Sequence, residues 1–453
     1  MKGRKQQAVL FEGIGPKRVE VEFTQPGQSS DGGMVLLKVM DEKMGLTRRM
    51  AEAIGDQRQA GKIDHAVLEM LRERVYGIAC GYPDCNDAQR MSRDPVMKMI
   101  CGQSPMGEES LASQPTLSRF ENAIRRTELL RLGYALTDTV IEQEKKRRRR
   151  NPPQRITIDM DPTEDPTYGD QQLTFFNGYY DNWCYLPMVT TIQFDLESDQ
   201  RLVAPVLRPG NAKGSLGAVS ILKRLVKRLR WAFGSVNIHV RLDGAFATPE
   251  VFRYLEDEGF SYVVNMAGNS VLQQYAEPMM KEIRRRAKES GRTEKMYGEV
   301  MYQAGKWESP RRTIIKAEVV VCEGHDNRDN ARFVVSNMRG TPKSVYREYT
   351  RRGDAENRIK ELKDGLCFDR TSCTRFDANQ FRNLLTAAAY ILYQELRVHA
   401  KGTECADAQV WILRERLIKI GVVIRESVRR ILLEGPRWYP WLDIFRRIAL
   451  RCT

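Results

Sequence analysis

Ile156-Thr-Ile-Asp-Met-Asp161 is the stretch on which the fold depends, because its apolar and polar residues alternate as in a β-strand with one buried face. Two further strands are predicted, at Leu186 to Phe194 and at Leu202 to Leu207, and the three together suggest a meander. An amphipathic helix from Val219 to Phe233 then precedes an alternating strand that ends at Asp243. This order predicts a crossover unit within an α/β sheet.

The segments on either side of this sheet divide the chain into further units. From about Met34 to Glu144 the apolar residues recur three and four apart, which predicts an all-α N-terminal domain over 1–150. The candidate DNA-binding segments described below also lie in this domain. A basic helical piece (Lys281 to Lys295) and the strand candidates after it predict a β-rich subdomain over 267–342, inserted between core segments 151–266 and 343–400. The remaining residues, 401–453, are predicted as a C-terminal helical region.

Composition excludes several classes of protein. The 453 residues are 42% hydrophobic and 29% charged, which is ordinary globular usage and excludes a disordered or fibrous chain. Lys and Arg number 73 against 59 Asp and Glu, and this net charge of +14 favours a nucleic-acid partner. Because no apolar run approaches the length of a membrane span, we expect a soluble cytoplasmic protein without a membrane partner. The nine cysteines form no C-x-x-C pair, so we expect free thiols and no structural metal.

Two segments are candidates for DNA contact. The run Lys145-Lys-Arg-Arg-Arg-Arg150 is expected to touch phosphates, through Arg148 and Arg149 among others. Ser113-Gln-Pro-Thr-Leu-Ser-Arg-Phe-Glu predicts a helix start that leaves Gln114 and Arg119 facing outward, as in helices that enter a major groove. The alternatives are a solvated helix end and an ordinary capped surface helix.

Acidic residues stand at the ends of two predicted strands. Asp161 closes the first and Asp243 closes the fourth, so the two carboxylates emerge at one edge of the sheet if these strands are neighbours. Such a pair makes a metal site plausible, while a turn or a helix cap is the alternative. Asp159 points to the same side of its strand as Asp161, so spacing alone does not choose between them.

Four residues of one predicted helix share a face. Tyr349, Arg352, Glu356 and Lys363 stand at offsets 0, 3, 7 and 14 and fall within roughly 60° of one another. This stripe carries an anion between donors, which suits a phosphate grip beside a metal-binding carboxylate. The alternative is an ion pair between Arg352 and Glu356 on a solvated helix.

These residues carry a resemblance to a known family. Tyr349-x2-Arg352-x3-Glu356-x6-Lys363 is similar to the Y-R-E-K signature of IS4-type DDE transposases. The contexts Ile158-Asp-Met-Asp161-Pro-Thr, Val240-Arg-Leu-Asp243-Gly-Ala-Phe and Ser113-Gln-Pro-Thr resemble the IS1380 family within that group, and the likeness extends over most of the chain.

The resemblance implies an RNase H-like catalytic core, interrupted by a β-strand insertion between the second Asp and the Glu. It makes Asp161, Asp243 and Glu356 the catalytic triad and the ligands of Mg²⁺ or Mn²⁺, with two ions expected. Asp161 is preferred to Asp159 because Asp-Pro-Thr resembles the D-x-T pattern after the first strand of these enzymes. Tyr349, Arg352 and Lys363 are then expected to bind phosphates near the cut.

The expected function is metal-dependent cleavage at transposon ends and strand transfer into target DNA. The expected partners are the terminal inverted repeats, the target DNA and a second copy of the chain, since transposon ends come in pairs. The predicted helices Phe381 to Leu396 and Ile412 to Leu433, or the N-terminal domain, are candidate subunit contacts. The alternatives are a non-catalytic sequence-specific DNA-binding protein and a metal-dependent nuclease that does not join DNA.

Overall fold

The computed structural model describes residues 8–11, 16–322 and 325–452 and is built around one mixed sheet. Three strands at one side of the sheet form an antiparallel meander, as predicted, but the third strand is Gln200–Leu202 and not the predicted Leu202 to Leu207. Two further strands run parallel to the first of the three. The strand order is β12-β13-β14-β11-β10-β4-β8-β9. The bounds are β4 (Arg155–Pro162), β8 (Met188–Phe194), β9 (Gln200–Leu202), β10 (Asn237–Leu242), β11 (Ser261–Met266), β12 (Glu294–Tyr302), β13 (Arg311–Val320) and β14 (Arg328–Ser336).

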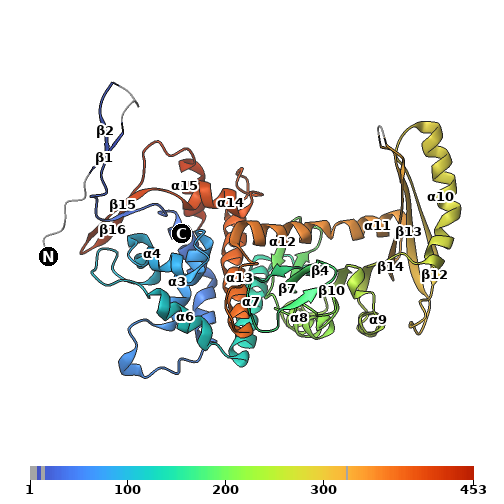
Figure 1. Ribbon diagram of the computed structural model, residues 1–453, viewed down its shortest axis with the longest axis horizontal. Coiled ribbons are helices and arrows are strands. Elements are labelled where there is room, and N and C mark those ends of the chain that lie inside the picture. The colour runs from blue at the N-terminus through green and yellow to red at the C-terminus, as the bar shows by residue number, and fades with distance from the viewer. Residues whose placement is uncertain (1–7, 12–15, 323–324, 453) are drawn as a thin grey trace.

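Helices cover both faces of the central strands. Figure 1 shows α11 (Pro342–Thr350) and α12 (Gly353–Leu366) above the sheet and α8 (Ala218–Phe233) below it, with α9 (Pro249–Asp257) beside α8. In β4, Ile156, Ile158 and Met160 are fully buried in the main core cluster, and the alternating Thr157 and Asp159 are buried as well, so the strand has two buried faces and not the single one predicted. The crossover β4–α8–β10 is therefore confirmed.

The segment expected as an inserted β-rich subdomain continues the central sheet. Its strand β14 pairs antiparallel with β11, with Val335 opposite Val264, and β13 and β12 follow outward. Before them comes α10 (Ser270–Ser290), which begins and ends earlier than the predicted basic helix. Gly291, in the left-handed region at φ 64°, ends α10 and lets the chain turn into β12.

The N-terminal part is mostly helical, but the expectation of an all-α domain over 1–150 is wrong. Two short strands pair with each other, and a third pairs with a C-terminal strand. The short strands have too few residues for a periodic signal. The elements are β1 (Val9–Phe11), β2 (Val19–Val21), β3 (Gln28–Ser29), α1 (Met34–Met44), α2 (Leu46–Glu52), a 3₁₀ turn (Ala60–Lys62), α3 (Val67–Ala79), α4 (Cys85–Met91), α5 (Pro95–Cys101), α6 (Gln114–Ala123) and α7 (Arg126–Arg147).

The C-terminal region is also less helical than predicted. The helix expected from Ile412 to Leu433 ends at Ile418, where a π-helical turn closes, and a β-hairpin follows. The β-branched run Val422-Val-Ile424 after Gly421 favours a strand, and this strand pairs with β3. The elements are α14 (Val410–Leu413), the π-helix (Arg414–Ile418), β15 (Val422–Ser427), β16 (Arg430–Glu434) and α15 (Leu442–Cys452).

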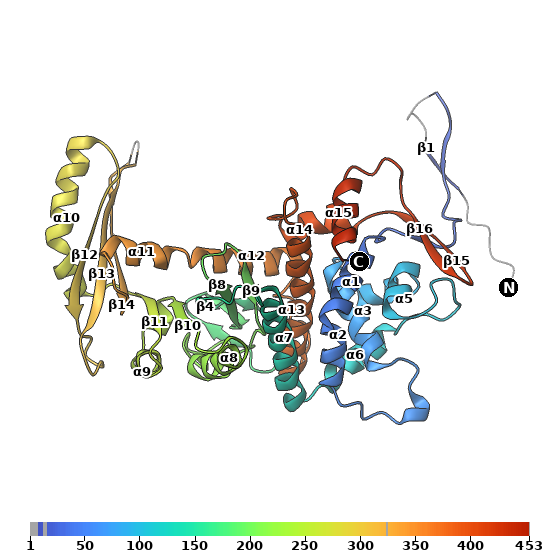
Figure 2. The same ribbon diagram turned by 180° about the vertical axis from the view of Figure 1, so that it is seen from behind.

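The long helix α13 (Phe376–His399) connects the N-terminal helices to the sheet. It packs against α1, α3 and α7 on one side and against α12 and β9 on the other, and its Tyr390 and Tyr393 are fully buried. Figure 2 shows α13 and α7 between the N-terminal helices and the sheet, with α10 at the far end. In the part of the chain that is described, no helix combines the length and the apolar character needed to cross a membrane.

Candidate active site

Asp161 and Asp243 meet at one edge of the sheet. Strands β4 and β10 are parallel neighbours with Met160 opposite Leu242, so the next residue of each strand is one of the two carboxylates. Asp243 also caps a short 3₁₀ turn (Gly244–Phe246), because its Oδ1 accepts a hydrogen bond of 2.9 Å from the Ala245 N–H. The cap that was the alternative interpretation of Asp243 is thus present and holds the carboxylate at this edge.

Arg352 links the first carboxylate to the third. Its Nη1 donates to Asp161 Oδ2 at 2.9 Å, and its Nη2 donates to Glu356. The Arg352 side chain is 12% exposed and that of Asp161 15%, whereas Glu356 in the first turn of α12 is 55% exposed. The structure therefore brings Asp161 and Glu356 together through one guanidinium that donates to both carboxylates.

The single helix predicted through Tyr349 and Lys363 is two helices. Helix α11 ends at Thr350 and α12 begins at Gly353, with Arg351 and Arg352 between them in right-handed helical conformation. Three-residue hydrogen bonds, such as the Arg352 N–H to the Tyr349 carbonyl at 2.9 Å, tighten the chain at this junction. The Gly at position 353 is the sequence signal that a continuous helix is weakened here.

Beyond the junction, α12 lines a cleft beside the carboxylates. The cleft has a volume of about 300 Å³, and its lining includes Asp161, Glu356 and Lys363. The Lys363 Nζ donates to the backbone carbonyl of Glu164, three residues after Asp161, so Lys363 stands at the wall of the cleft. Lys360 and Asp364 also line it, and sequence reasoning missed both, although they follow Glu356 on α12 by four and by eight residues.

Burial and like charges dominate the electrostatics of the site. Burial raises the pKa of Asp161 to about 7; Arg352 opposes this shift, and the charges of Asp243 and Glu356 add to it. Burial also raises the pKa of Asp243, against the Ala245 hydrogen bond and Arg352. The positive charge around these two carboxyls therefore does not compensate their burial and mutual repulsion.

Asp159 is engaged elsewhere. It is fully buried and receives two hydrogen bonds from Arg241, of 2.8 Å from Nε and 2.6 Å from Nη2, and one of 3.0 Å from Gln200. These bonds occupy both of its oxygens. Of the two acidic residues that spacing left open, only Asp161 lines the cleft.

The carboxylates of Asp161, Asp243 and Glu356 are the type of ligand that a hard divalent cation prefers. Three carboxylates and water are the ligands that Mg²⁺ and Mn²⁺ prefer, and the raised pKa of Asp161 marks a place where a cation is favoured. Within the described ranges, however, no three His, Cys, Asp or Glu side chains are arranged to hold an ion. The Arg352 guanidinium supplies the bridging positive charge between Asp161 and Glu356.

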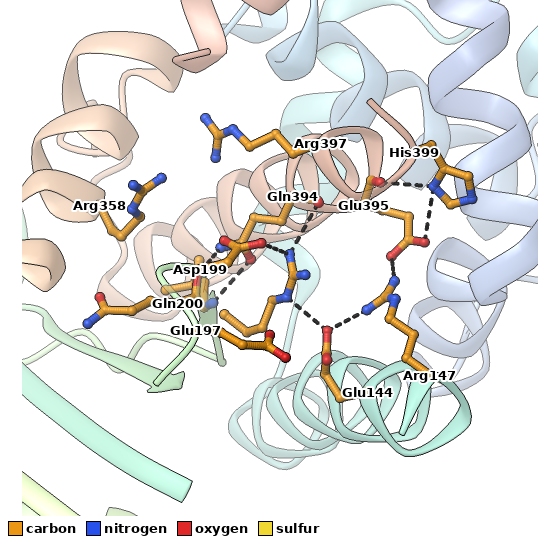
Figure 3. A network of polar contacts seen from close by, with 12 residues as sticks. Glu144, Arg147, Glu197, Asp199, Gln200, Arg358, Gln394, Glu395, Arg397 and His399 are labelled. Carbon is orange, nitrogen blue, oxygen red and sulfur yellow. Dashed lines mark hydrogen bonds and ion pairs between the residues drawn. The ribbon is translucent and has the colours of Figure 1, made fainter. Parts of the chain in front are cut away.

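In the basic run at the end of α7, some side chains form ion pairs within the protein and others are exposed to solvent. Figure 3 shows Arg147 between Glu144 and Glu395. Arg148 is 11% exposed, pairs with Glu144 and Glu197 and lies 4.3 Å from the ring centroid of Phe194, so its predicted role in phosphate contact is corrected. Arg149 is exposed, as predicted.

The predicted recognition helix exists as α6, with Ser113 at its N-cap position. Arg119 is exposed, donates to Thr116 Oγ1 at 3.1 Å and lines a cleft of about 750 Å³. Gln114 lies in the first turn, where its backbone N–H donates to Gln89 Oε1 at 2.8 Å. Both residues belong to the N-terminal helices and do not line the cleft of Asp161 and Glu356.

One comparison with known proteins gives a match. A search of curated proteins gave no match. The comparison with protein families matches residues 11–452 to the family described as "Transposase DDE domain group 1". The match covers nearly the whole chain, including the three carboxylates, so the chain belongs to the DDE transposase domain family.

Proposed function

We propose that this protein cuts DNA at transposon ends and joins the cut strands to target DNA, with Asp161, Asp243 and Glu356 as the catalytic carboxylates. DNA cleavage of the transposase type follows from the family; the residue roles and the cut-and-paste course are our proposal. The observation that carries it is the Arg352 bridge from Asp161 to Glu356, at the sheet edge where Asp243 also stands. We further propose that β4, β8, β9, β10 and β11 form an RNase H-like core, into which α10 and β12–β14 are inserted.

Asp161, Asp243 and Glu356 would hold Mg²⁺ or Mn²⁺, as two ions. When bound, such ions supply Lewis-acid stabilisation of the attacking and leaving oxygens at phosphorus. Arg352 then has no need to neutralise the carboxylates, and its guanidinium is free to bind a DNA phosphate bidentately. Lys363 at the cleft wall and Tyr349 at the end of α11 support the same phosphate group.

The remaining residues keep this arrangement in place. Arg241 fixes Asp159 inside the sheet, and the Ala245 N–H holds Asp243 at the edge. A water molecule is the nucleophile for cutting and a DNA 3′-hydroxyl for joining, so one site serves both reactions. We assign the chain to the IS1380 family of the Y-R-E-K group and expect a homodimer on paired terminal repeats.

The test is a cutting assay on DNA that carries the ends of the protein's own element, with Mg²⁺. We expect Asp161→Ala, Asp243→Ala and Glu356→Ala to retain DNA binding and to lose cutting by at least about a thousand-fold, since the site acts as a unit. Undiminished cutting by Glu356→Ala would overturn the assignment.

Two other functions predict different outcomes of the same assay. A metal-dependent nuclease would cut but would not covalently join the cut end to a second duplex. A non-catalytic DNA-binding protein would bind the ends and leave them intact. Joined product from the wild type, absent from the Glu356→Ala reaction, supports the transposase.

A further inference from the structure

Six exposed cations line one side of the molecule. Lys223, Arg224 and Lys227 stand on the outer face of α8, and Lys145, Arg149 and Arg150 stand at and just after the end of α7. We call these six residues the basic strip. Among the residues that the structure describes, none of the six side chains has an acidic partner within 4.0 Å.

Three exposed arginines of another strongly basic helix are neutralised, which distinguishes them from the cations of the strip. On α10, Arg284 pairs with Glu277 and Asp329, Arg285 with Glu282 and Glu289, and Arg286 with Glu282. Both helices are basic, but in the described part of the chain these three arginines of α10 have acidic partners, whereas Lys223, Arg224 and Lys227 of α8 have none. The unpaired cations of the strip therefore contribute directly to the net charge of +14.

The two parts of the strip are joined by an aromatic contact. Trp231 near the end of α8 is 79% exposed, and the Lys145 Nζ lies 5.4 Å from its ring centroid. Helices α7 and α8 pack against each other, so the cations of α8 lead into those of α7. A surface that consists mainly of cations, with one exposed ring among them, suits an anionic partner better than an apolar one.

The strip begins at the same sheet edge as the carboxylates. Gly214, in the loop before α8, lies so near Ala245 that a Cβ at Gly214 would come within 2.3 Å of the Ala245 Cβ. Ala245 belongs to the turn that Asp243 caps. The buried side chain of Arg208 fixes this loop by donating from Nη1 to the Gly214 carbonyl at 2.7 Å. Exposed Lys213 in the same loop extends the positive charge toward the site.

From this edge α8 runs to the opposite edge of the sheet, where β10 begins. Its 16 residues span about 24 Å, the length of roughly seven base pairs of duplex DNA. Arg149 and Arg150 lie just before β4, at the end of that strand away from Asp161. A phosphate at the carboxylates is thus too far from these arginines, but a duplex running from the site along α8 reaches both ends of the strip.

We propose that the basic strip binds the phosphate backbone of the duplex flanking the phosphodiester that is cut, over about seven base pairs. This inference rests on the proposed function for the position of the cut. It takes Arg149 as a phosphate contact and excludes Arg148, whose guanidinium is paired inside the protein.

The test compares two triple variants in DNA binding without metal. Lys223→Gln/Arg224→Gln/Lys227→Gln removes three cations of the strip, and Arg284→Gln/Arg285→Gln/Arg286→Gln removes three paired cations from α10. Binding of a 20-base-pair duplex of mixed sequence is followed by fluorescence anisotropy in EDTA between 50 and 200 mM KCl. Circular dichroism checks that both variants are folded.

We expect the strip variant to reduce the slope of log K against log salt by about 2 to 3, at about 0.9 for each lost phosphate contact. The α10 variant has the same net charge and should keep the wild-type slope within about 0.5. On DNA carrying the element's end, hydroxyl-radical protection of about seven base pairs beside the cut should disappear in the strip variant alone.

Equal slopes for the wild type and the strip variant would overturn the inference, as would an equal loss in the α10 variant. A changed oligomeric mass with an unchanged slope would also overturn it and would make the strip a protein interface. Glu356→Gln separates the two proposals: if it still cuts, the proposed function fails, while the slope of the strip variant still decides whether the strip binds DNA.

Discussion

At the scale of single residues, Arg352 combines two tasks that a lysine cannot. Its two terminal nitrogens reach Asp161 and Glu356 at once, which a single ammonium on a flexible stem does not reproduce. We expect Arg352→Lys to lower DNA cutting by about 10- to 100-fold, the loss of one charge-assisted hydrogen bond in the transition state.

The matched control is Arg351→Lys, at a neighbouring arginine whose side chain is 40% exposed and pairs with Glu348. It should leave the rate of cutting within about two-fold of wild type. Initial rates of cleavage at saturating Mg²⁺ provide the comparison. Cutting by Arg352→Lys at the wild-type rate would remove Arg352 from the site.

Asp159 is expected to stabilise the fold, whereas Asp161 is expected to serve activity without stabilising the fold. Asp159→Asn breaks a fully buried pair and leaves the buried Arg241 guanidinium with the 3.9 Å contact to Glu348, so we expect the free energy of unfolding to fall by about 3 kcal/mol. Asp161→Asn removes a carboxylate whose charge is disfavoured in the folded state and should leave this free energy unchanged or higher. Urea titrations at pH 7 measure both, and equal destabilisation by the two variants would contradict this division.

Glu73 makes stability depend on pH. It is fully buried, and burial raises its pKa to about 8, against a hydrogen bond from the Ala112 N–H. A pKa raised from 4.5 means that the folded state keeps the proton while the unfolded state loses it. Its contribution to stability is therefore present below pH 4.5 and is lost as the pH rises to about 8.

We expect Glu73→Gln, which cannot ionise, to become more stable relative to wild type between pH 5 and pH 8, by about 2 to 4 kcal/mol. Urea unfolding of both proteins at the two pH values measures this difference. Parallel pH profiles for the two proteins would show that Glu73 is charged in the fold.

At the scale of elements, the insertion is structurally bound to the sheet. Strand β14 covers the edge of β11, and Val345 and Tyr346 of α11 pack against Val263, Ile314 and Val334. We expect replacement of residues 268–339 by a short Gly-Ser linker to yield aggregated protein, because β11 becomes an exposed hydrophobic edge. Solubility and size-exclusion chromatography measure this outcome.

A Gly-Ser insertion in the turn between β12 and β13, residues 303–310, is the control. It leaves the pairing of β14 with β11 intact and should remain soluble and monodisperse on the same column. A soluble deletion variant with the wild-type unfolding transition would mean that 267–342 is an independent subdomain after all.

Elements with strong periodicity were predictable, and those decided by distant partners were not. The alternation of Ile156 to Asp161 and the amphipathic spacing of α8 suffice for the crossover, because each pattern fits one regular structure. The break at Arg351 has no proline to mark it, and its local signal, Gly353, weakens a helix without requiring it to end. Pairing of β15 with β3 joins opposite ends of the chain, and no local pattern reports such a contact.

The candidate site divides in the same way. Convergence of Asp161 and Asp243 follows from parallel neighbouring strands and was predictable. The engagement of Asp159 with Arg241 and of Arg148 with Glu197 depends on side chains from other elements, which spacing does not report. The sequence thus shows which residues are charged, but only the fold shows which of them are free to bind a metal ion or DNA.

At the scale of the whole molecule, α13 makes the N-terminal helices and the sheet one folding unit. A polar network reinforces its packing: Arg201 of β9 donates to Glu144 of α7 at 2.8 Å and to the Gln394 carbonyl of α13 at 3.2 Å. Figure 3 shows this network between the two helices. The carboxylate edge and the basic strip are therefore parts of one packed unit, as simultaneous contact with a single duplex requires.

The central claim is that Asp161, Asp243 and Glu356 jointly bind divalent cations, and Mn²⁺ binding followed by electron paramagnetic resonance tests it most directly. The wild type should bind two ions at pH 7.5. Asp161→Asn, Asp243→Asn and Glu356→Gln should each lose at least one, while Asp170→Asn, at an exposed carboxylate in the loop beyond Asp161, should bind as the wild type. Unchanged stoichiometry and affinity in the three site variants would contradict the claim.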